Sequence, residues 1–214
     1  MPRATHHCHD LLRAHLAPGD TVIDATAGNG HDTLLLTQLT APGGTVFAFD
    51  IQPAALAATR RRLESAGTAA ESWHLIHAGH ETMLTAIPPL HHGKVAAVVF
   101  NLGYLPGGDH SLVTTAGTTL PAIHAALTLL RPGGIVIAVL YPGHPGGAEE
   151  AHAVRACAAA LPSTHWPTGE FTNLETARPA PSVLLIQKAR DTTDGATQFP
   201  LSLTIPPSIT PPVP

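Results

Sequence analysis

The sequence has few charged residues, few cysteines and no long hydrophobic run, and each shortage excludes a class of protein. Charged residues make up 12% of the 214 positions, and the formal net charge is −4. This balance argues against a strong nonspecific nucleic-acid binder, but it allows a protein that reads a local RNA shape through a small patch. Cys8 and Cys157 make no disulfide framework. No apolar run approaches the roughly 18 residues of a membrane-spanning helix, and residues 1–10 contain no signal-peptide core. We therefore expect a cytoplasmic protein without a membrane segment.

The hydrophobic content of the chain and the prolines near its end indicate one globular domain followed by a tail. The chain is 44% hydrophobic, which suffices for a full core in a single domain. From Gly195 on there is no charged residue, and prolines are frequent. We predict a domain over residues 1–190 and a disordered, polyproline-like tail over residues 191–214. The 15 histidines could add positive charge just below neutral pH, or could reflect composition bias.

The stretch from Thr21 to Gln52 predicts a strand, a glycine turn, a helix and a second strand. Its first strand is β-branched and apolar and ends at Asp24, as expected of a buried parallel strand. Gly28 and Gly30 allow a tight turn that a ligand can approach closely. Asp50 ends the second strand, about twenty residues after the turn, where a carboxylate can hold ribose hydroxyls.

Two ligand classes use this layout. A dinucleotide site requires Gly-x-Gly-x-x-Gly or Ala, because the third small residue lets helix and strand pack closely over a pyrophosphate. The third position here is Thr33. A site for S-adenosylmethionine (SAM) requires acids such as Asp24 and Asp50 at the two strand ends and a Gly-x-Gly turn between them. The pattern favours SAM over a nicotinamide or flavin, with a purely structural turn as the third interpretation.

Strand and helix patterns alternate along the remaining chain, which indicates an α/β doubly wound sheet. Seven mostly parallel strands with a terminal antiparallel hairpin would match the class I SAM-dependent methyltransferase architecture. Further strands are expected at residues 73–77, 95–100, 135–140, 165–171 and 182–188, and helices at residues 3–17, 54–65, 118–130 and 149–161.

Two clusters attract attention without defining a site. His6-His7-Cys8-His9 resembles a metal cluster, but neighbouring residues on a helix point in different directions and cannot share one ion. We predict no metal site. Arg60-Arg61-Arg62 is either a solvated helix face or a phosphate contact.

Polar residues follow the third and fourth expected strands. Ligands of open parallel sheets lie at the carboxyl ends of the strands, so His80 and Glu81 could border an adenine. They could equally form a polar loop and a helix start, where Glu is favourable.

The loop Asn101-Leu-Gly-Tyr-Leu-Pro-Gly-Gly-Asp109 has an outline similar to the Asn-Pro-Pro-Tyr loop of methyltransferases that act on exocyclic amino groups. An Asn carbonyl can accept an N–H bond of an amine and so orient its lone pair, and the ring of Tyr104 can stack on a base. A turn residue at Asn101 and a core role for Tyr104 are the alternatives. An alkylamine must also lose a proton before it can react, and His144 and Asp109 with His110 are the candidates for that step.

The chain resembles the MnmM (YtqB) family of SAM-dependent tRNA methyltransferases, formerly described as rRNA methylases. The resemblance covers about residues 6–189. It rests on the segments Asp24–Thr33, Phe49–Gln52, Gly79–Glu81, Phe100–Asp109 and Tyr141–Gly147 with Glu150. The segment Asn-Leu-Gly-Tyr-Leu-Pro-Gly-Gly is the most specific of these.

The resemblance implies that the protein methylates the 5-aminomethyl group of 2-thiouridine at the tRNA wobble position, so the anticodon stem-loop would be its partner. The implied SAM-binding residues, together with those proposed above, are Asp24, Gly28, Asn29, Gly30, Asp50, Gln52, His80, Glu81 and Asn101. The implied RNA contacts would fall to the few basic residues, which are Arg3, Arg13, Arg60 to Arg62 and Arg178.

Other functions stay open at the level of the sequence. A methyltransferase of the same fold could act on rRNA or on a small amine, in keeping with the acidic balance. A nicotinamide-dependent oxidoreductase and a non-catalytic SAM-binding module are further alternatives, and a homodimer is one of the oligomeric states open to the chain.

Overall fold

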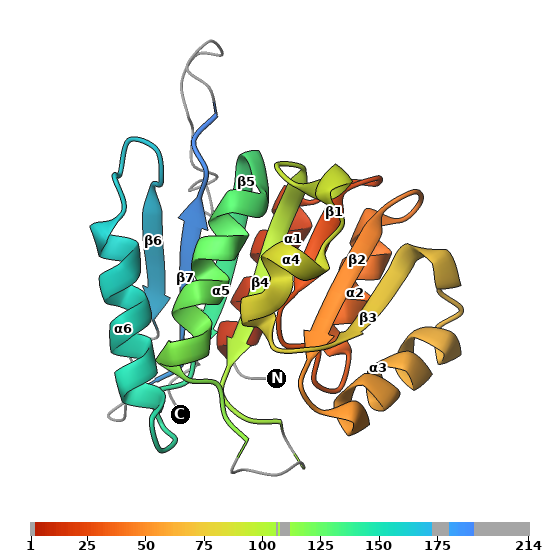
Figure 1. Ribbon diagram of the computed structural model, residues 1–214, viewed down its shortest axis with the longest axis horizontal. Coiled ribbons are helices and arrows are strands. Elements are labelled where there is room, and N and C mark those ends of the chain that lie inside the picture. The colour runs from red at the N-terminus through yellow and green to blue at the C-terminus, as the bar shows by residue number, and fades with distance from the viewer. Residues whose placement is uncertain (1–2, 106, 108–111, 173–179, 191–214) are drawn as a thin grey trace, which may run out of the picture.

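The computed structural model describes residues 3–105, 107, 112–172 and 180–190. Seven strands form one sheet in the order β3-β2-β1-β4-β5-β7-β6 (Figure 1). Strands β1 to β5 are parallel to one another, whereas β7 is antiparallel to both β5 and β6. The predicted doubly wound sheet with a terminal antiparallel hairpin is confirmed. The strands are β1 Thr21–Asp24, β2 Thr45–Asp50, β3 Trp73–His77, β4 Val95–Leu102, β5 Leu130–Leu140, β6 Thr168–Thr172 and β7 Ser182–Gln187.

Helices cover both faces of the sheet, and each face has its own apolar core (Figure 1). Side chains alternate along each strand, so Val22 of β1 packs on one face and Ile23 on the other. The α-helices α1 Arg3–His15, α2 His31–Thr40 and α3 Pro53–Ser65 pack on the first face, and α4 Met83–Ala86, α5 Ala116–Leu129 and α6 Gly147–Ala160 pack on the second. Short 3-10 helices span Ala70–Ser72, His80–Thr82 and Pro89–His91. None of the described helices is long and apolar enough to cross a membrane.

Strand β4 lies in the centre of the sheet and is longer than predicted. Residues Val95 to Phe100 are fully buried, as expected of a parallel strand covered on both faces. The strand continues to Leu102 because Asn101 and Leu102 pair with Val139 and Leu140 of β5. Asn101 is therefore part of the sheet rather than of the loop that follows it.

Strand β5 begins earlier than predicted, at Leu130. The segment Arg131-Pro132-Gly133-Gly134 was expected to be a turn, but it lies within the strand at an irregularity of the β4–β5 pairing. The guanidinium of Arg131 donates to the carboxylate of Asp20 at 2.6 Å, and the Gly133 N–H donates to the carbonyl of Lys188. Val95 pairs with Leu130 and Ala97 already pairs with Ile135, and Gly133 has a φ of +78°. The expected turn is therefore present as a bulge within β5, and these long-range bonds hold it in place.

The first strand of the terminal hairpin is shorter than predicted. Residues 163–165 form a turn, and the N–H groups of His165 and Trp166 both donate to the carbonyl of Pro162. Strand β6 consequently starts at Thr168. The predicted tail, residues 191–214, and most of the connector between β6 and β7 lie outside the described residues.

Candidate active site

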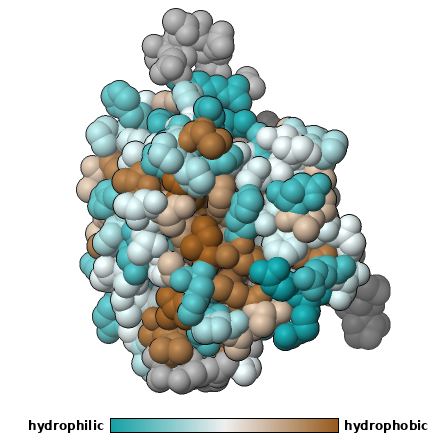
Figure 2. Space-filling model, turned by 45° about the vertical axis from the view of Figure 1, so that its right-hand side comes forward, coloured by the Kyte–Doolittle hydropathy of each residue, from teal (hydrophilic) through white to brown (hydrophobic). Residues whose placement is uncertain are grey.

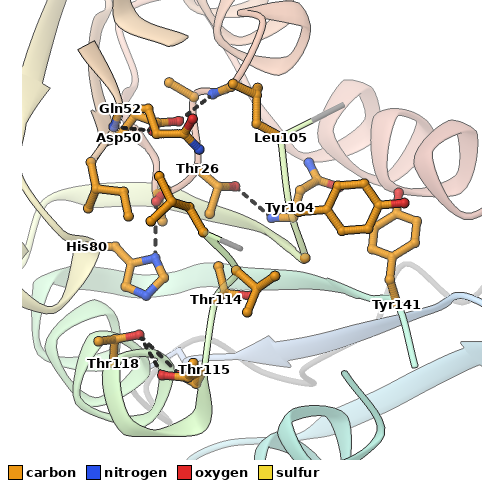
Figure 3. A pocket seen from close by; sticks show the side chains of 18 of the residues that line it. Thr26, Asp50, Gln52, His80, Tyr104, Leu105, Thr114, Thr115, Thr118 and Tyr141 are labelled. Atoms are coloured by element: carbon orange, nitrogen blue, oxygen red, sulfur yellow. Dashed lines mark hydrogen bonds between the residues drawn. The ribbon is translucent and has the colours of Figure 1, made fainter. Parts of the chain in front are cut away.

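A cavity of about 830 Å³ opens at the carboxyl ends of β1, β2, β4 and β5. Ligand sites of open α/β sheets lie at this edge, and such sites typically enclose about 300 to 1,000 Å³. Figure 3 shows Asp50, Gln52 and His80 on one side of the cavity and Tyr104 and Tyr141 on the other. The cavity therefore has a half next to β2, which we call the cofactor half, and a half next to Tyr104 and Tyr141, which we call the acceptor half.

Part of the cavity lining consists of large apolar side chains that are exposed to solvent. Figure 2 shows a largely hydrophilic surface that hydrophobic side chains interrupt in the middle and lower part of the visible face. Among the described residues, the large hydrophobic side chains that are exposed include Ile51, Tyr104 and Leu112, and all three line the cavity. An apolar, partly aromatic mouth suits a planar base that must be stacked.

The glycine turn between β1 and α2 has the conformation that its sequence predicts. Gly28 and Gly30 have φ angles of +53° and +77°, which residues with a side chain rarely adopt. Gly28 lines the cavity directly. Gly30 lies behind it, where a Cβ atom would come within 2.7 Å of the Thr59 Cα on α3. One glycine thus leaves room for a ligand, and the other lets α3 pack against the turn.

Asp50 lies at the end of β2 and lines the half of the cavity next to that strand. Its carboxylate accepts the N–H of Gly28 at 2.9 Å and the N–H of Gln52 at 2.8 Å. Asp50 is half-buried and lines the cavity together with Asn29 and Gln52. A carboxylate oxygen can accept more than one hydrogen bond, so Asp50 retains capacity for a hydroxyl donor.

Asp24 lies beneath the turn and does not line the cavity. It is fully buried, accepts the Thr33 hydroxyl at 2.6 Å and accepts the Thr26 N–H at 3.1 Å. Burial raises the pKa of Asp24 to about 7, and the nearby charge of Asp32 contributes in the same direction. The structure thus places Asp24 as a support of the turn rather than at the ligand surface.

His80 and Glu81 both line the cavity, at the end of β3. The His80 Nδ1–H donates to the carbonyl of Ala25 at 3.2 Å, and the ring lies edge-on to Phe100. Burial lowers the pKa of His80, so the ring is neutral at neutral pH. His80 therefore presents an apolar, uncharged wall, whereas Glu81 is exposed at the rim.

The acceptor half brings together three of the four residues expected to act on the substrate. Asn101, Tyr104 and His144 line it, and the rings of Tyr104 and His144 meet edge-to-face with centroids 5.9 Å apart. The backbone of Tyr104 pairs with Val113 in an isolated bridge, which places the ring at the rim. Asp109 and its neighbour His110 lie outside the described residues.

Sequence reasoning missed three residues that hold Asn101 in place. The Thr26 hydroxyl accepts the Asn101 N–H at 2.8 Å. The Asn101 side-chain amide donates to the carboxylate of Asp32, and the ring of His9 meets the other oxygen of that carboxylate at 2.6 Å. Thr26 and Asp32 lie inside the glycine-turn motif, which was the available signal. His9 belongs to the histidine cluster of α1, where no sequence pattern distinguishes it.

Two arginines of the run on α3 contact other residues of the fold. The guanidinium of Arg60 lies over the ring of Trp73, 5.2 Å from its centroid. Arg62 donates to the carbonyl of Asn29 at 2.7 Å and to His31 Nε2 at 3.1 Å. A phosphate contact, the second of the two alternatives for this run, is not tested by these bonds. Among the described residues, no group of three or more histidine, cysteine, aspartate or glutamate side chains could hold a metal ion.

The sheet order, the glycine turn and the cavity at the strand ends together define a class I methyltransferase fold. The chain belongs to the family whose model, described as "Putative rRNA methylase", matches residues 46–187.

Relatives agree with this assignment. A curated protein of Arabidopsis thaliana, named tRNA (mnm(5)s(2)U34)-methyltransferase, chloroplastic, is 39% identical over 196 residues, which cover 88% of this chain and 70% of the relative. A solved structure described as a putative rRNA methylase from Clostridium thermocellum superimposes with a TM-score of 0.82 at 37% identity, covering 86% of this chain and 97% of that one. A putative methyltransferase from Streptococcus mutans, solved in complex with SAH, superimposes with a TM-score of 0.77 at 33% identity. The superposition covers 88% of this chain and 99% of that one.

Proposed function

We propose that the protein transfers a methyl group from SAM to the 5-aminomethyl group of 2-thiouridine at the wobble position of tRNA. The product would be the 5-methylaminomethyl form. The name of the Arabidopsis relative supports this substrate, and the SAH complex of the Streptococcus relative supports this cofactor. The partner would be the anticodon stem-loop, and the reaction would take place in the cytoplasm.

The residues of the cofactor half fit SAM. Gly28 leaves space against the backbone, Asp50 offers carboxylate oxygens suited to ribose hydroxyls, and the neutral ring of His80 offers a wall for an adenine. When bound, SAM supplies an electrophilic methyl group. The protein's own part is then to align a nucleophile behind that methyl group, and alignment alone can provide much of a rate enhancement.

The orientation of the Asn101 amide is the observation that carries the proposal. A carboxylate can only accept hydrogen bonds, so the Asn101 group facing Asp32 must be its NH₂. The carbonyl oxygen is left as the acceptor of this side chain for a donor in the cavity. An amine that donates one N–H to this oxygen has its lone pair directed elsewhere, which is what methyl transfer to nitrogen requires.

Tyr104 fits a base that has been turned out of an RNA loop. Its ring lies at the cavity rim with 42% of its surface exposed. Bases in single-stranded RNA loops are commonly recognised by stacking on aromatic side chains. We expect the ring of Tyr104 to stack on the wobble base while its aminomethyl group reaches Asn101.

The proposed function can be tested with tRNA from cells that lack the terminal methylation. The purified protein is incubated with SAM and this tRNA, and the digested nucleosides are weighed. We expect a gain of one methyl group on 5-aminomethyl-2-thiouridine. Asn101→Ala and Tyr104→Ala should each lower the initial rate at least tenfold, whereas Thr85→Ala, an exposed change on α4, should not.

Full methylation by both cavity variants would refute the site assignment. No methyl gain by the natural protein, with SAM binding intact, would refute the tRNA substrate but retain the fold and cofactor. Ribosomal RNA and small amines would then be assayed in the same way, since the family description names rRNA.

A further inference from the structure

A hydrogen-bonded chain of three side chains leads from α1 into the acceptor half of the cavity. His9 Nε2 lies 2.6 Å from Asp32 Oδ1, and Asp32 Oδ2 accepts the amide N–H of Asn101. The three residues come from α1, α2 and β4, so the chain connects elements that are distant in sequence. His9 and Asp32 are both buried, with 6% and 8% of their surfaces exposed.

The pattern of these bonds fits an ionised Asp32. Both oxygens of its carboxyl group accept a hydrogen bond, one from the His9 ring N–H and the other from Asn101. The neighbouring Asp24 has a pKa raised to about 7 by burial and by the charge of Asp32. The charge of Asp32 thus acts on Asp24 as well as on its two hydrogen-bond partners.

Asp32 borders the cavity at the place where the acceptor amine would bind. It lines the cavity together with Asn101, and its carboxylate is one hydrogen bond away from the Asn101 side chain. An alkylammonium group on Asn101 Oδ1 would thus lie close to a buried anion. Such a charge attracts the cation strongly because little water screens it.

We propose that Asp32 accepts the proton of the acceptor ammonium before methyl transfer and that His9 positions it for this step. The inference rests on the proposed function, because it requires an alkylamine as acceptor. One N–H bond of the ammonium breaks and an O–H bond forms on Asp32, which leaves the lone pair on nitrogen. The amine nitrogen then attacks the methyl group, which forms the N–C bond and breaks the S–C bond. The electron pair of the broken S–C bond stays on sulfur. The product is a secondary ammonium ion, and Asp32 later releases its proton to water.

His144, the histidine that the sequence suggested for this role, is less well placed. Its Nδ1–H donates to the carbonyl of Pro145 at 3.0 Å, so the lone pair is on Nε2. That atom has almost no accessible surface and no hydrogen-bond partner among the described residues. Gly103 and Gly147 lie close against this part of the ring. The His144 lone pair is therefore enclosed by the loop, whereas the Asp32 carboxylate borders the cavity.

The test separates a proton acceptor from a residue that only positions Asn101. Asp32→Asn removes the charge, yet its amide oxygen can accept from Asn101 and its NH₂ can donate to the other tautomer of His9. Single-turnover methylation of the aminomethyl tRNA is measured from pH 5 to pH 10 with saturating SAM. We expect the natural protein to reach its full rate near neutral pH. Asp32→Asn should be at least a hundredfold slower at pH 7 and should recover as the pH rises, because the amine then loses its proton to the solvent.

A second pair of variants probes the same step through His9. His9→Ala removes a donor to the Asp32 carboxylate, which disfavours the ionised form. In His9→Ala, the midpoint of the pH–rate profile should move to higher pH by about one unit. In His9→Gln, whose amide can donate to Asp32, the midpoint should return to that of the natural protein. The other titratable groups that face Asp32 are Cys8 on α1, His31 on α2, Asp24 on β1 and Tyr141 after β5. His152→Gln, an exposed change on α6, is the matched control and should keep the natural rate and midpoint. His144→Gln should leave the midpoint unchanged.

Several outcomes would overturn the inference. Asp32→Asn could keep its rate at pH 7, or it could lose the same factor at every pH, as expected of a positioning role alone. His9→Ala could slow the reaction without moving the midpoint, which would count against Asp32 even if Asp32→Asn failed to fold. A shifted midpoint in His144→Gln would assign the proton to His144. Absence of methyl transfer by the natural protein would instead refute the proposed function, and the inference with it.

Discussion

The carboxylate of Asp50 accepts the backbone N–H of Gly28 at 2.9 Å, which ties the end of β2 to the turn after β1. The two residues are 22 positions apart and line the same half of the cavity. The acid at the strand end therefore has two tasks, since it fixes the turn and faces the ligand.

Replacement of Asp50 tests the position of the cofactor. Asp50→Ala removes the acceptor of the Gly28 N–H and the carboxylate proposed for the ribose hydroxyls. We expect SAM affinity to fall at least tenfold in isothermal titration calorimetry. Asp10→Ala, which removes an exposed acid of α1, should leave it unchanged. Equal affinities for Asp50→Ala and the natural protein would show that SAM binds in another pose.

Replacement of Gly30 tests the packing of α3 against the turn. A Cβ atom at Gly30 would meet the Thr59 Cα at 2.7 Å, whereas one at Gly67, with a similar positive φ, would meet nothing within 4 Å. Both Ala variants carry the cost of a left-handed backbone, about 1 to 2 kcal/mol. Gly30→Ala should lose clearly more free energy of unfolding than Gly67→Ala in urea titrations. Equal losses would mean that the backbone conformation alone requires glycine.

Stability should depend on pH through Asp24. Its pKa is raised from 3.8 to about 7 in the folded protein, so the native state binds this proton more tightly than the unfolded chain does. The free energy of unfolding contributed by Asp24 therefore falls as the pH rises from about 4 to about 7. Asp24→Asn is neutral throughout; its amide oxygen can accept the Thr26 N–H, and its NH₂ can donate to the Thr33 hydroxyl. Its stability should decline less than that of the natural protein between pH 5 and pH 7.5, and parallel declines would contradict the assignment.

Thr26 should matter to catalysis through the backbone of Asn101. Its hydroxyl accepts the Asn101 N–H at 2.8 Å and lines the cavity. Thr26→Val removes this acceptor while conserving shape, and Thr26→Ser retains it. We expect Thr26→Val to lower kcat by about tenfold on aminomethyl tRNA, since small misplacements of reacting groups are costly. Thr26→Ser should remain within threefold, and two equal rates would show that the hydroxyl is dispensable.

Cofactor choice can be checked by thermal denaturation. A ligand that binds only the native state stabilises it by about 2.7 kcal/mol at a hundred times its dissociation constant. SAM and SAH should raise the melting temperature, and NAD at equal concentration should not. Stabilisation by NAD alone would revive the oxidoreductase alternative.

Most of the fold could be predicted because its signals are local. The alternating strand and helix patterns predict the parallel sheet, and the glycines of the first turn predict where the backbone borders the cavity. The errors lie where distant residues override local chemistry. Arg131 to Gly134 turns as its composition predicts, with a positive φ at Gly133, yet bonds to Asp20 and Lys188 incorporate it into strand β5 as a bulge.

The cofactor half was more predictable than the acceptor half for a similar reason. Gly28 and Asp50 follow from spacing within one strand–turn–helix–strand unit. Asp24 shares that spacing, but whether its side chain faces the ligand or the core depends on Thr26 and Thr33. The link from His9 to Asn101 joins three elements through 92 positions of sequence, and no local pattern encodes such a contact.

The position of β7 has a consequence for synthesis of the protein. This strand is buried along its whole length and lies between β5 and β6, although it follows both in the chain. Until it is made, β5 presents an unpaired edge and β6 has no partner in the sheet. Open strand edges of this kind promote association between chains, so nascent chains that stall before residue 182 should be especially prone to aggregate and to need chaperones.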